Sequence, residues 1–237
     1  GYGVIFTLRE ALNEQGIDIT KTTASVQGFG NVAQHAVELY TKLGGKVVCV
    51  SCWDRDDKKS YTFRKMSGVT REELLPITNK FGTVDKVKAK ELGYEILPGD
   101  DWIAQEVDIL LPCALENQIN AESVQKINAS VKMIVEGANG PTSLEADEVI
   151  KQRNIYVVPD FLANAGGVTC SYFEQVQCNM NYFWPKEEVL EKLNAKMVSA
   201  FKAVSQCARD RNLYMRDAAY AIAVERVATA CQKRGWV

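Results

Sequence analysis

Residues 22–51 read TTASVQGFGNVAQHAVELYTKLGGKVVCVS, and their pattern is the strongest indication of the fold class. The β-branched run at 22–27 predicts a short strand that ends in a glycine turn. Residues 31–43 have the pattern of a helix, which Gly44 and Gly45 end. Residues 46–51 form a second β-branched run. A strand, a helix and a strand in this order predict a parallel α/β sheet.

The rest of the chain repeats this alternation of short apolar runs and longer helical patterns. Residues 2–15 predict a helix before the first strand, and the polar segment 53–85 predicts an excursion from the sheet. Further helices are expected near 70–80, 85–92, 121–129 and 143–153, and extended segments at 94–97, 107–112, 131–136 and 155–160. Beyond Asp160 the pattern is helical to the end of the chain.

We therefore expect an α/β fold, a doubly wound Rossmann-type sheet that is rich in parallel strands, with a C-terminal helical extension. Residues 1–185 would form the Rossmann core and 186–237 the C-terminal helices. In the second part, apolar residues recur every three or four positions, as on the buried face of a helix. They include Val189, Leu193, Met197, Phe201 and Val204.

Composition excludes several functional classes. A net charge of −2 gives no broad attraction to nucleic acid or anionic lipid, and no apolar stretch approaches the ~20 residues that span a bilayer. The seven cysteines are scattered and odd in number, which is typical of a reducing cytoplasm. Cys49 and Cys52 form a C-x-x-C without a second pair, so we expect no metal. The sequence begins at Gly1 without a signal peptide and looks like part of a longer chain.

Directly after the first expected strand stands the sequence GFGNVA, residues 28–33. Its G-x-G-x-x-A spacing allows a tight turn at Gly28, close approach of a pyrophosphate at Gly30 and close packing of the helix at Ala33. The helix that follows offers free N–H groups and the positive end of its dipole. The position of this motif between a strand and a helix predicts a dinucleotide site.

The end of the second strand is where such sites usually place a carboxylate for the adenosine ribose. This chain has Cys52, Trp53 and Asp54 there. Asp54 could reach the ribose, or Arg55 and Lys58 could accept a 2′-phosphate, or all of them could be solvated turn residues. Trp53 and Asp54 leave little room for a phosphate, which favours NAD over NADP.

Three more loops follow strands that are expected to end at the same edge. They read PCALEN at 112–117, EGANGPT at 136–142, and PD at 159–160 leading to NAGGV at 164–168. Small residues let a flat ring approach the backbone, and an Asn amide can both donate and accept hydrogen bonds. These loops are therefore candidates for the rest of a dinucleotide site.

The motifs GFGNVA, PCALEN, EGANGPTS and PDFLANAGGVTCSYFEQVQ together resemble the glutamate, leucine, phenylalanine and valine dehydrogenases. AGGVTCSYFE and the closing RVATACQKRGW are most similar to the glutamate dehydrogenases. The resemblance runs from Gly1 to Val237. Two departures are Gln175, where the family usually has Trp, and Cys52, where it often has an acid or Gly.

This resemblance implies a role for each matching position. Gly28, Phe29, Gly30, Asn31 and Val32 would bind the pyrophosphate, and Cys113 and Ala114 would line the adenosine and ribose path. Asn139 and Asn164 would hold the nicotinamide ribose and carboxamide. Val168 and Ser171 would reach the substrate, with the Ser171 hydroxyl on its side-chain carboxylate. A hydroxyl that only satisfies the start of a helix is the alternative for Ser171.

In this family the catalytic Lys and Asp belong to an N-terminal domain, which this sequence lacks. No catalytic residue is therefore expected here, and His35 reads as an ordinary helix residue. The resemblance implies oxidative deamination of L-glutamate to 2-oxoglutarate and ammonia, with the N-terminal domain of the same enzyme and a homohexamer as partners. The chain alone should bind NAD or NADP without turnover. Two alternatives remain, a branched-chain or aromatic amino-acid dehydrogenase and a non-catalytic Rossmann nucleotide-binding module.

Overall fold

A computed structural model describes residues 1–236, and its central feature is a seven-stranded sheet with the order β4-β3-β2-β1-β5-β6-β7. The strands β2, β1, β5, β6 and β7 are parallel, whereas β3 and β4 run antiparallel at one edge. The strands are β1 (Thr23–Gln27), β2 (Lys46–Asp54), β3 (Lys59–Arg64), β4 (Glu95–Pro98), β5 (Ile109–Pro112), β6 (Met133–Val135) and β7 (Tyr156–Val158). This arrangement confirms the doubly wound α/β fold.

Helical segments cover both faces of the sheet. One face packs against α1 (Tyr2–Glu14) and α2 (Asn31–Lys42), and the other packs against the 3-10 helix η3 (Gly99–Ala104) and α5 (Leu144–Gln152). Strand β2 sends Val47 and Val50 to the first face and Val48 to the second. Burial on both faces explains why this strand reads as a continuous apolar run and not as an alternating one.

Two segments differ from the expectation. The excursion at 53–85 adds β3 to the sheet, because Thr62 and Phe63 are buried there beside β2. Short helices follow as α3 (Arg71–Leu74), η2 (Leu75–Ile77) and α4 (Lys86–Glu91). The helix expected near 121–129 is only a 3-10 turn, η4 (Ser123–Lys126). Just before it, the Asn120 side chain accepts hydrogen bonds from the N–H groups of Glu122 and Ser123. Asparagine stabilises such turns at the expense of a regular helix.

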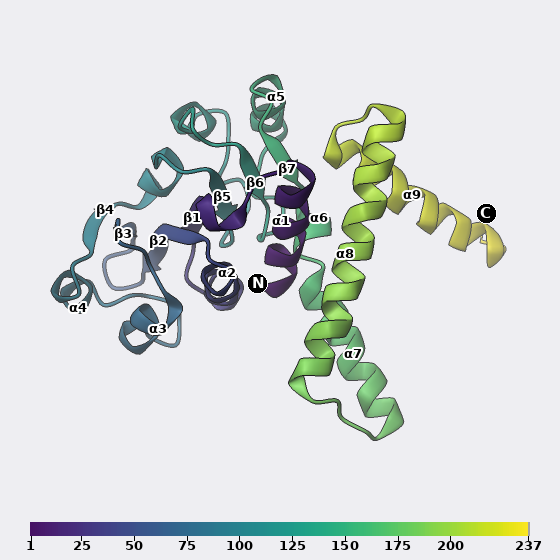
Figure 1. Ribbon diagram of the computed structural model, residues 1–237, viewed down its shortest axis with the longest axis horizontal. Coiled ribbons are helices and arrows are strands. Elements are labelled where there is room, and N and C mark those ends of the chain that lie inside the picture. Colours follow the sequence, from purple (N-terminus) through teal and green to yellow (C-terminus); the bar gives the residue numbers. More distant parts are fainter. Residues whose placement is uncertain (237) are drawn as a thin grey trace.

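The chain beyond β7 is helical, as α6 (Asp160–Ala163), α7 (Gly166–Met180), α8 (Lys186–Arg211) and α9 (Met215–Lys233). In Figure 1, α8 stands beside α1 at the side of the sheet. A small core joins α1, α7 and α8 through Phe6, Phe173, Leu193 and Met197. The division at 185/186 remains a prediction, since α7 already packs against α8.

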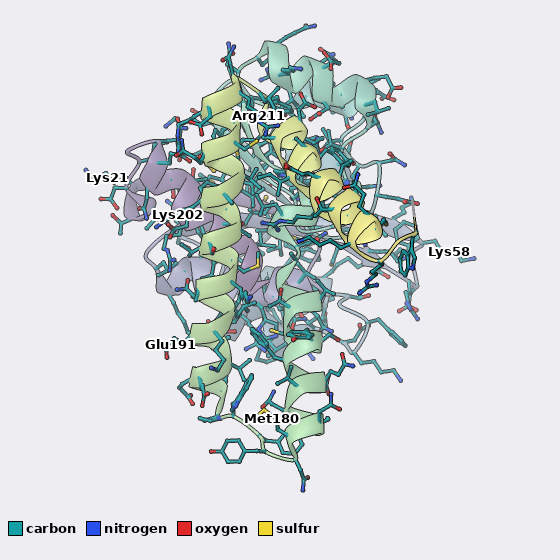
Figure 2. All side chains as sticks on the ribbon, turned by 90° about the vertical axis from the view of Figure 1, so that its right-hand side faces the viewer. Lys21, Lys58, Met180, Glu191, Lys202 and Arg211 are labelled. Atoms are coloured by element: carbon teal, nitrogen blue, oxygen red, sulfur yellow. The ribbon has the colours of Figure 1, made fainter. Side chains whose placement is uncertain are left out.

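Helix α9 is buried only near its start. Met215, Ala218 and Ala219 are buried, whereas Val224 and Val227 are each 64% exposed. The later turns of α9 point away from the sheet in Figure 1, and Figure 2 shows α8 and α9 diverging from the end of α8 at Arg211. No helix within residues 1–236 combines the length and the apolar character that crossing a bilayer requires.

Candidate functional site

The carboxyl edge of the sheet has a switch point between β1 and β5. The chain leaves β1 through α2 to β2 on one side, and β5 lies on the other side of β1. Gln27 and Pro112 are paired at the ends of these two strands. Ligands of doubly wound sheets bind outside the carboxyl ends at such a point. The glycine turn and the loops after β5, β6 and β7 all start from this edge.

The glycine turn has the geometry of an anion cradle. Gly28 has φ +94°, and a Cβ there would lie 2.9 Å from the Cβ of Ala114. Gly30 is the N-cap of α2, has φ −79°, and no side chain caps the helix start. A Cβ at Gly30 would meet no heavy atom within 4 Å, so the helix start is open on that side, while Gly82 lies against the backbone of Phe29 and Gly30 on another. An anion of pyrophosphate type fits there, because uncapped N–H groups and the helix dipole attract it.

The other residues of the turn divide into buried and exposed ones. Phe29 is 1% exposed, and its carbonyl accepts from the Gln34 side chain at 2.8 Å, so its ring belongs to the core. Asn31 is exposed at the first position of α2, and Val32 is half-buried behind it. Only the backbone of Phe29 remains to face a ligand, whereas the side chain of Asn31 is accessible.

A cavity of about 520 Å³ lies near the β2–β3 turn, and a second of about 470 Å³ lies beside the switch point. The second is lined by Gln27, Ser51 and Gln118, among others. The Gln27 amide donates to Gln118 Oε1 at 2.9 Å, but Gln27 Oε1 is buried without a hydrogen-bond partner. A buried acceptor left unpaired is costly, so a donor supplied by a ligand would fit this cavity.

The residues expected at the ribose have other neighbours in the fold. The Cys52 side chain is buried in the core, and this burial raises the pKa of its thiol to about 11. Asp54 Oδ1 accepts from the backbone N–H groups of Asp56 and Asp57, and Oδ2 lies 2.9 Å from Lys86 Nζ, which lowers the pKa of Asp54. Asp54 thus shapes the β2–β3 turn, and its contact with a ribose remains a prediction.

Trp53 is 53% exposed, and its carbonyl accepts from Thr83 Oγ1 at 2.9 Å. The Arg55 guanidinium stacks at 3.7 Å from the centre of the Phe81 ring. Of the positions weighed for the ribose and its 2′-phosphate, Trp53 and Lys58 are therefore exposed, and the Arg55 guanidinium is held on an aromatic ring. The two cysteines of the C-x-x-C motif lie in separate core clusters, Cys49 in one and Cys52 in the other.

The loop after β5 packs tightly against the glycine turn. Cys113 is buried, which raises the pKa of its thiol to about 12. A Cβ at Gly137 would lie 2.6 Å from its sulfur, and Gly137 N–H donates to the Pro112 carbonyl. Ala114 is exposed and touches Gly28. Small residues at these positions let three loops meet without a gap.

The loops after β6 and β7 meet through two asparagines. Asn164 Nδ2 donates to Asn139 Oδ1 at 2.7 Å and to the Ala138 carbonyl at 3.3 Å. Asp160 Oδ2 accepts from Gly140 N–H at 2.8 Å, which joins the same loops a second time. Asn139 is exposed and Asn164 half-buried. The fold thus brings together two amides that are more than twenty residues apart in the sequence.

Val168 and Ser171 lie one turn apart near the start of α7, and both are exposed. Positions three apart on a helix are neighbours on its surface. Ser171 is the sixth residue of α7 and therefore does not cap it. Its side chain is free to meet a group outside this chain.

Sequence reasoning missed Gln27, Ser51 and Gln118. The sequence feature that could have indicated Gln27 is a long polar side chain at the last position of a buried strand. Ser51 accepts from Gly28 N–H at 3.3 Å and so supports the glycine turn from the neighbouring strand. Within residues 1–236, no group of three or more His, Cys, Asp or Glu side chains is placed to hold a metal ion.

The chain is similar to known enzymes over its whole length. The family model described as Glutamate/Leucine/Phenylalanine/Valine dehydrogenase matches residues 1–235. An NAD-specific glutamate dehydrogenase of Clostridioides difficile is 41% identical over 237 residues, 100% of this chain and 54% of that protein. A glutamate dehydrogenase of Thermotoga maritima is 43% identical over 236 residues, 99% of this chain and 54% of that protein.

A solved glutamate dehydrogenase structure has a TM-score of 0.90 at 30% identity and covers 99% of this chain and 53% of its own. The chain thus spans about half the length of the relatives it matches. Its glycine turn, its switch point and its paired asparagines lie within the matched region. The chain belongs to the Glutamate/Leucine/Phenylalanine/Valine dehydrogenase family.

Proposed function

We propose that the chain binds NAD along the carboxyl edge of its sheet and forms one wall of an active site that deaminates L-glutamate oxidatively to 2-oxoglutarate and ammonia. The observation that carries the proposal is the uncapped N-terminus of α2, which opens at Gly30 beside the switch point. When bound, NAD supplies the nicotinamide that accepts a hydride from the substrate.

The residues of this chain would bind and orient the cofactor. The backbone from Gly28 to Val32 would bind the pyrophosphate. The cavity at Gln27 and Ser51 would accept the adenine, and Gln27 Oε1 would gain the donor it lacks. Cys113 and Ala114 would line the path between these two positions.

At the other end of the edge, Asn139 and Asn164 would hold the nicotinamide ribose and carboxamide. Their mutual hydrogen bond fixes both amides before a ligand arrives. Preorganised polar groups lose less conformational entropy on binding, so this pair is suited to presenting one face of a nicotinamide ring.

NAD is the preferred form of the cofactor in this proposal. A relative that is 41% identical is named NAD-specific, and the cavity beside the β2–β3 turn is lined by Asp54, Asp56 and Asp57. Lys86, which pairs with Asp54 and Asp57, and Lys88 also line this cavity, but together with Asp85 the carboxylates outnumber them. This excess of negative charge would disfavour a 2′-phosphate. Arg55 and Lys58 are the counter-arguments from the same turn; the Arg55 guanidinium already stacks on Phe81, whereas Lys58 is exposed.

The substrate and the protein partners would come from beyond this chain. Val168 and Ser171 are exposed on α7 and would face L-glutamate across a cleft closed by the N-terminal domain of the same enzyme. The catalytic Lys and Asp of the family would lie in that domain, and the complete enzyme would assemble as a homohexamer. The chain alone would therefore bind cofactor without turnover.

Calorimetric titration with ADP-ribose, NAD and NADP tests the proposal. We expect binding of ADP-ribose and NAD, and weaker binding of NADP. No binding of ADP-ribose or NAD to the folded chain would overturn the cofactor site. Glutamate-dependent reduction of NAD by the purified chain would contradict the absence of turnover.

A further inference from the structure

Arg216, in the first turn of α9, is half-buried and lies among three carboxylates. Its Nη1 and Nη2 each donate to Glu136 at 2.8 Å, and its Nε and Nη2 donate to Asp147 at 2.9 and 3.1 Å. Asp160 Oδ1 lies 3.8 Å from Nη1. The Arg216 side chain is 14% exposed and that of Glu136 is fully buried. Such a fork on two carboxylates is a geometry that Arg provides and Lys does not.

Glu136 also connects this cluster to the loops at the carboxyl edge. Its Oε2 accepts from Asp160 N–H at 2.9 Å, at the start of α6. Asp160 in turn accepts from Gly140 N–H through its carboxylate and from Asn164 N–H through its carbonyl, both at 2.8 Å. Gly140 follows Asn139 in the chain, so the two contacts of Asp160 hold the loops of both paired asparagines.

The positive charge of Arg216 is what allows Glu136 and Asp160 to lie together and to join the loops after β6 and β7. Burial alone would lower the pKa of its guanidinium, but Glu136 and Asp147 raise it well above its usual value. Without Arg216, Glu136 would be an unpaired charge in the core, close to the carboxylate of Asp160. A buried carboxylate in that position is strongly unfavourable and would push the two loops apart.

We propose that Arg216 is a positioning residue that holds Asn139 and Asn164 in register for the nicotinamide half of the cofactor. It acts through Glu136 and Asp160 and touches no ligand itself. The inference rests on the proposed function, because it assumes that these asparagines meet the nicotinamide. It adds that the start of α9, a C-terminal element, determines how that half of the site is built.

The experiment separates the two halves of the cofactor. ADP carries the adenosine and the two phosphates but neither the second ribose nor the nicotinamide, whereas the fluorescence of NADH reports how its nicotinamide is held. We expect Arg216→Met to bind ADP within twofold of the original chain. The same variant should lose about tenfold in NADH affinity, together with most of the emission change on binding. Arg216→Lys keeps the charge but not the fork, so its loss should be smaller.

Arg153→Met is the matched control. Arg153 is also half-buried, and it donates to the carbonyls of Val124, Ile127 and Asn128, away from the asparagine pair. This change should lower the unfolding temperature without a selective effect on NADH. If Arg216→Met does not fold, Arg216→Lys is measured in its place.

The outcomes distinguish the two proposals. Absence of ADP binding by the original chain would contradict the cofactor site itself. ADP binding without any NADH emission change in the original chain would contradict only the role of the asparagine pair, and with it this inference. Equal losses for both ligands, or no loss for either, in a folded Arg216 variant would also overturn the positioning role.

Discussion

At the scale of single residues, the two glycines of the turn are required for different reasons. Gly28 has a left-handed backbone, with φ +94°, and has no room for a Cβ beside Ala114. Gly30 has an ordinary backbone, with φ −79° and ψ −168°, and has open space where a Cβ would go. The first glycine is therefore required by the fold, and the second by the ligand that we propose.

Gly30→Val should abolish binding of ADP-ribose and NAD with little change in stability. The branched side chain would fill the space outside the helix N-terminus, where the pyrophosphate would lie. Calorimetric titration and thermal unfolding on the same sample measure the two effects. Gly28→Ala is the contrasting variant, and it should cost about 1–3 kcal/mol through backbone strain and the contact with Ala114. Undiminished affinity in folded Gly30→Val would refute the phosphate turn.

Cys52 shows that a position in the sequence does not decide where a side chain points. A carboxylate is expected at the end of the second strand, yet the Cys52 side chain is 6% exposed and lies in the core. Cys52→Asp should therefore lower stability by about 2–3 kcal/mol, because the new carboxyl would lose its hydration. Thermal unfolding measures this cost. Trp53→Asp, at an exposed neighbour, should cost much less, and equal costs would contradict the burial of position 52.

At the scale of elements, α2 is tied to its surroundings by Glu38. Its carboxylate binds Lys42 Nζ at 2.6 Å and His35 Nδ1 at 3.3 Å, and Arg71 Nη1 at the start of α3 lies 3.8 Å away. The hydrogen bond from Lys42 is the main reason that the pKa of Glu38 falls to about 2, although partial burial opposes it. The helix that carries the glycine turn is thereby held against α3.

This pairing predicts a pH dependence of stability. A carboxyl whose pKa is lower in the folded state than in the unfolded chain stabilises the fold above the unfolded pKa, here 4.5. The contribution declines as the pH falls from there towards about 2. Since Lys42 is largely exposed, Glu38→Gln should cost only about 1–2 kcal/mol at pH 7.

Thermal unfolding of the original chain and of Glu38→Gln between pH 7 and pH 3 measures this contribution. The difference in unfolding temperature should be largest at pH 7 and should shrink below pH 4.5. Glu91→Gln, at an exposed position at the end of α4, is the control and should have little effect at either pH. A constant difference down to pH 3 would show that the charge of Glu38 is not what stabilises α2.

At the scale of the whole molecule, the sheet, α1 and α8 form successive layers, and α7 and α9 leave exposed faces. Figure 2 shows α7 and α8 meeting at the Met180 end, while α9 separates from α8 at Arg211. Val168 and Ser171 lie on the exposed part of α7. A site built here would be open on one side, so its specificity would depend on what covers this face.

Ser171→Ala, made in a complete enzyme that includes this chain, should lower kcat/KM for glutamate by roughly ten- to a hundredfold. A hydrogen bond to a charged group typically contributes about 1.5–3 kcal/mol, which corresponds to that range. Steady-state kinetics with glutamate and with small apolar amino acids test it. Activity on the apolar substrates should change much less, because they have no second carboxylate. Equal losses on both substrates would make Ser171 a structural residue.

The glycine turn was predictable because its conformation is local, whereas the contact between Asn139 and Asn164 joins residues that are far apart in the chain. A strand, a G-x-G turn and a helix follow one another in the chain, so each can be recognised without knowing the partners. Strand β3 and Gln27 were not predictable in the same way. β3 exists because Thr62 and Phe63 pack beside β2, and Gln27 becomes a candidate site residue only because Gln118 and Ser51 line the same cavity.

The amino-acid sequence was enough for the doubly wound fold and the glycine turn, because hydrophobic periodicity and glycine conformation depend on neighbours in the chain. It was enough for the family through the resemblance of its motifs. Only the tertiary structure decided that Cys52 faces the core, that Asp54 serves the β2–β3 turn, and that Arg216 joins Glu136. Burial, ion pairing and unpaired polar atoms depend on residues far apart in the chain, which meet only when the sheet and its helices close around them.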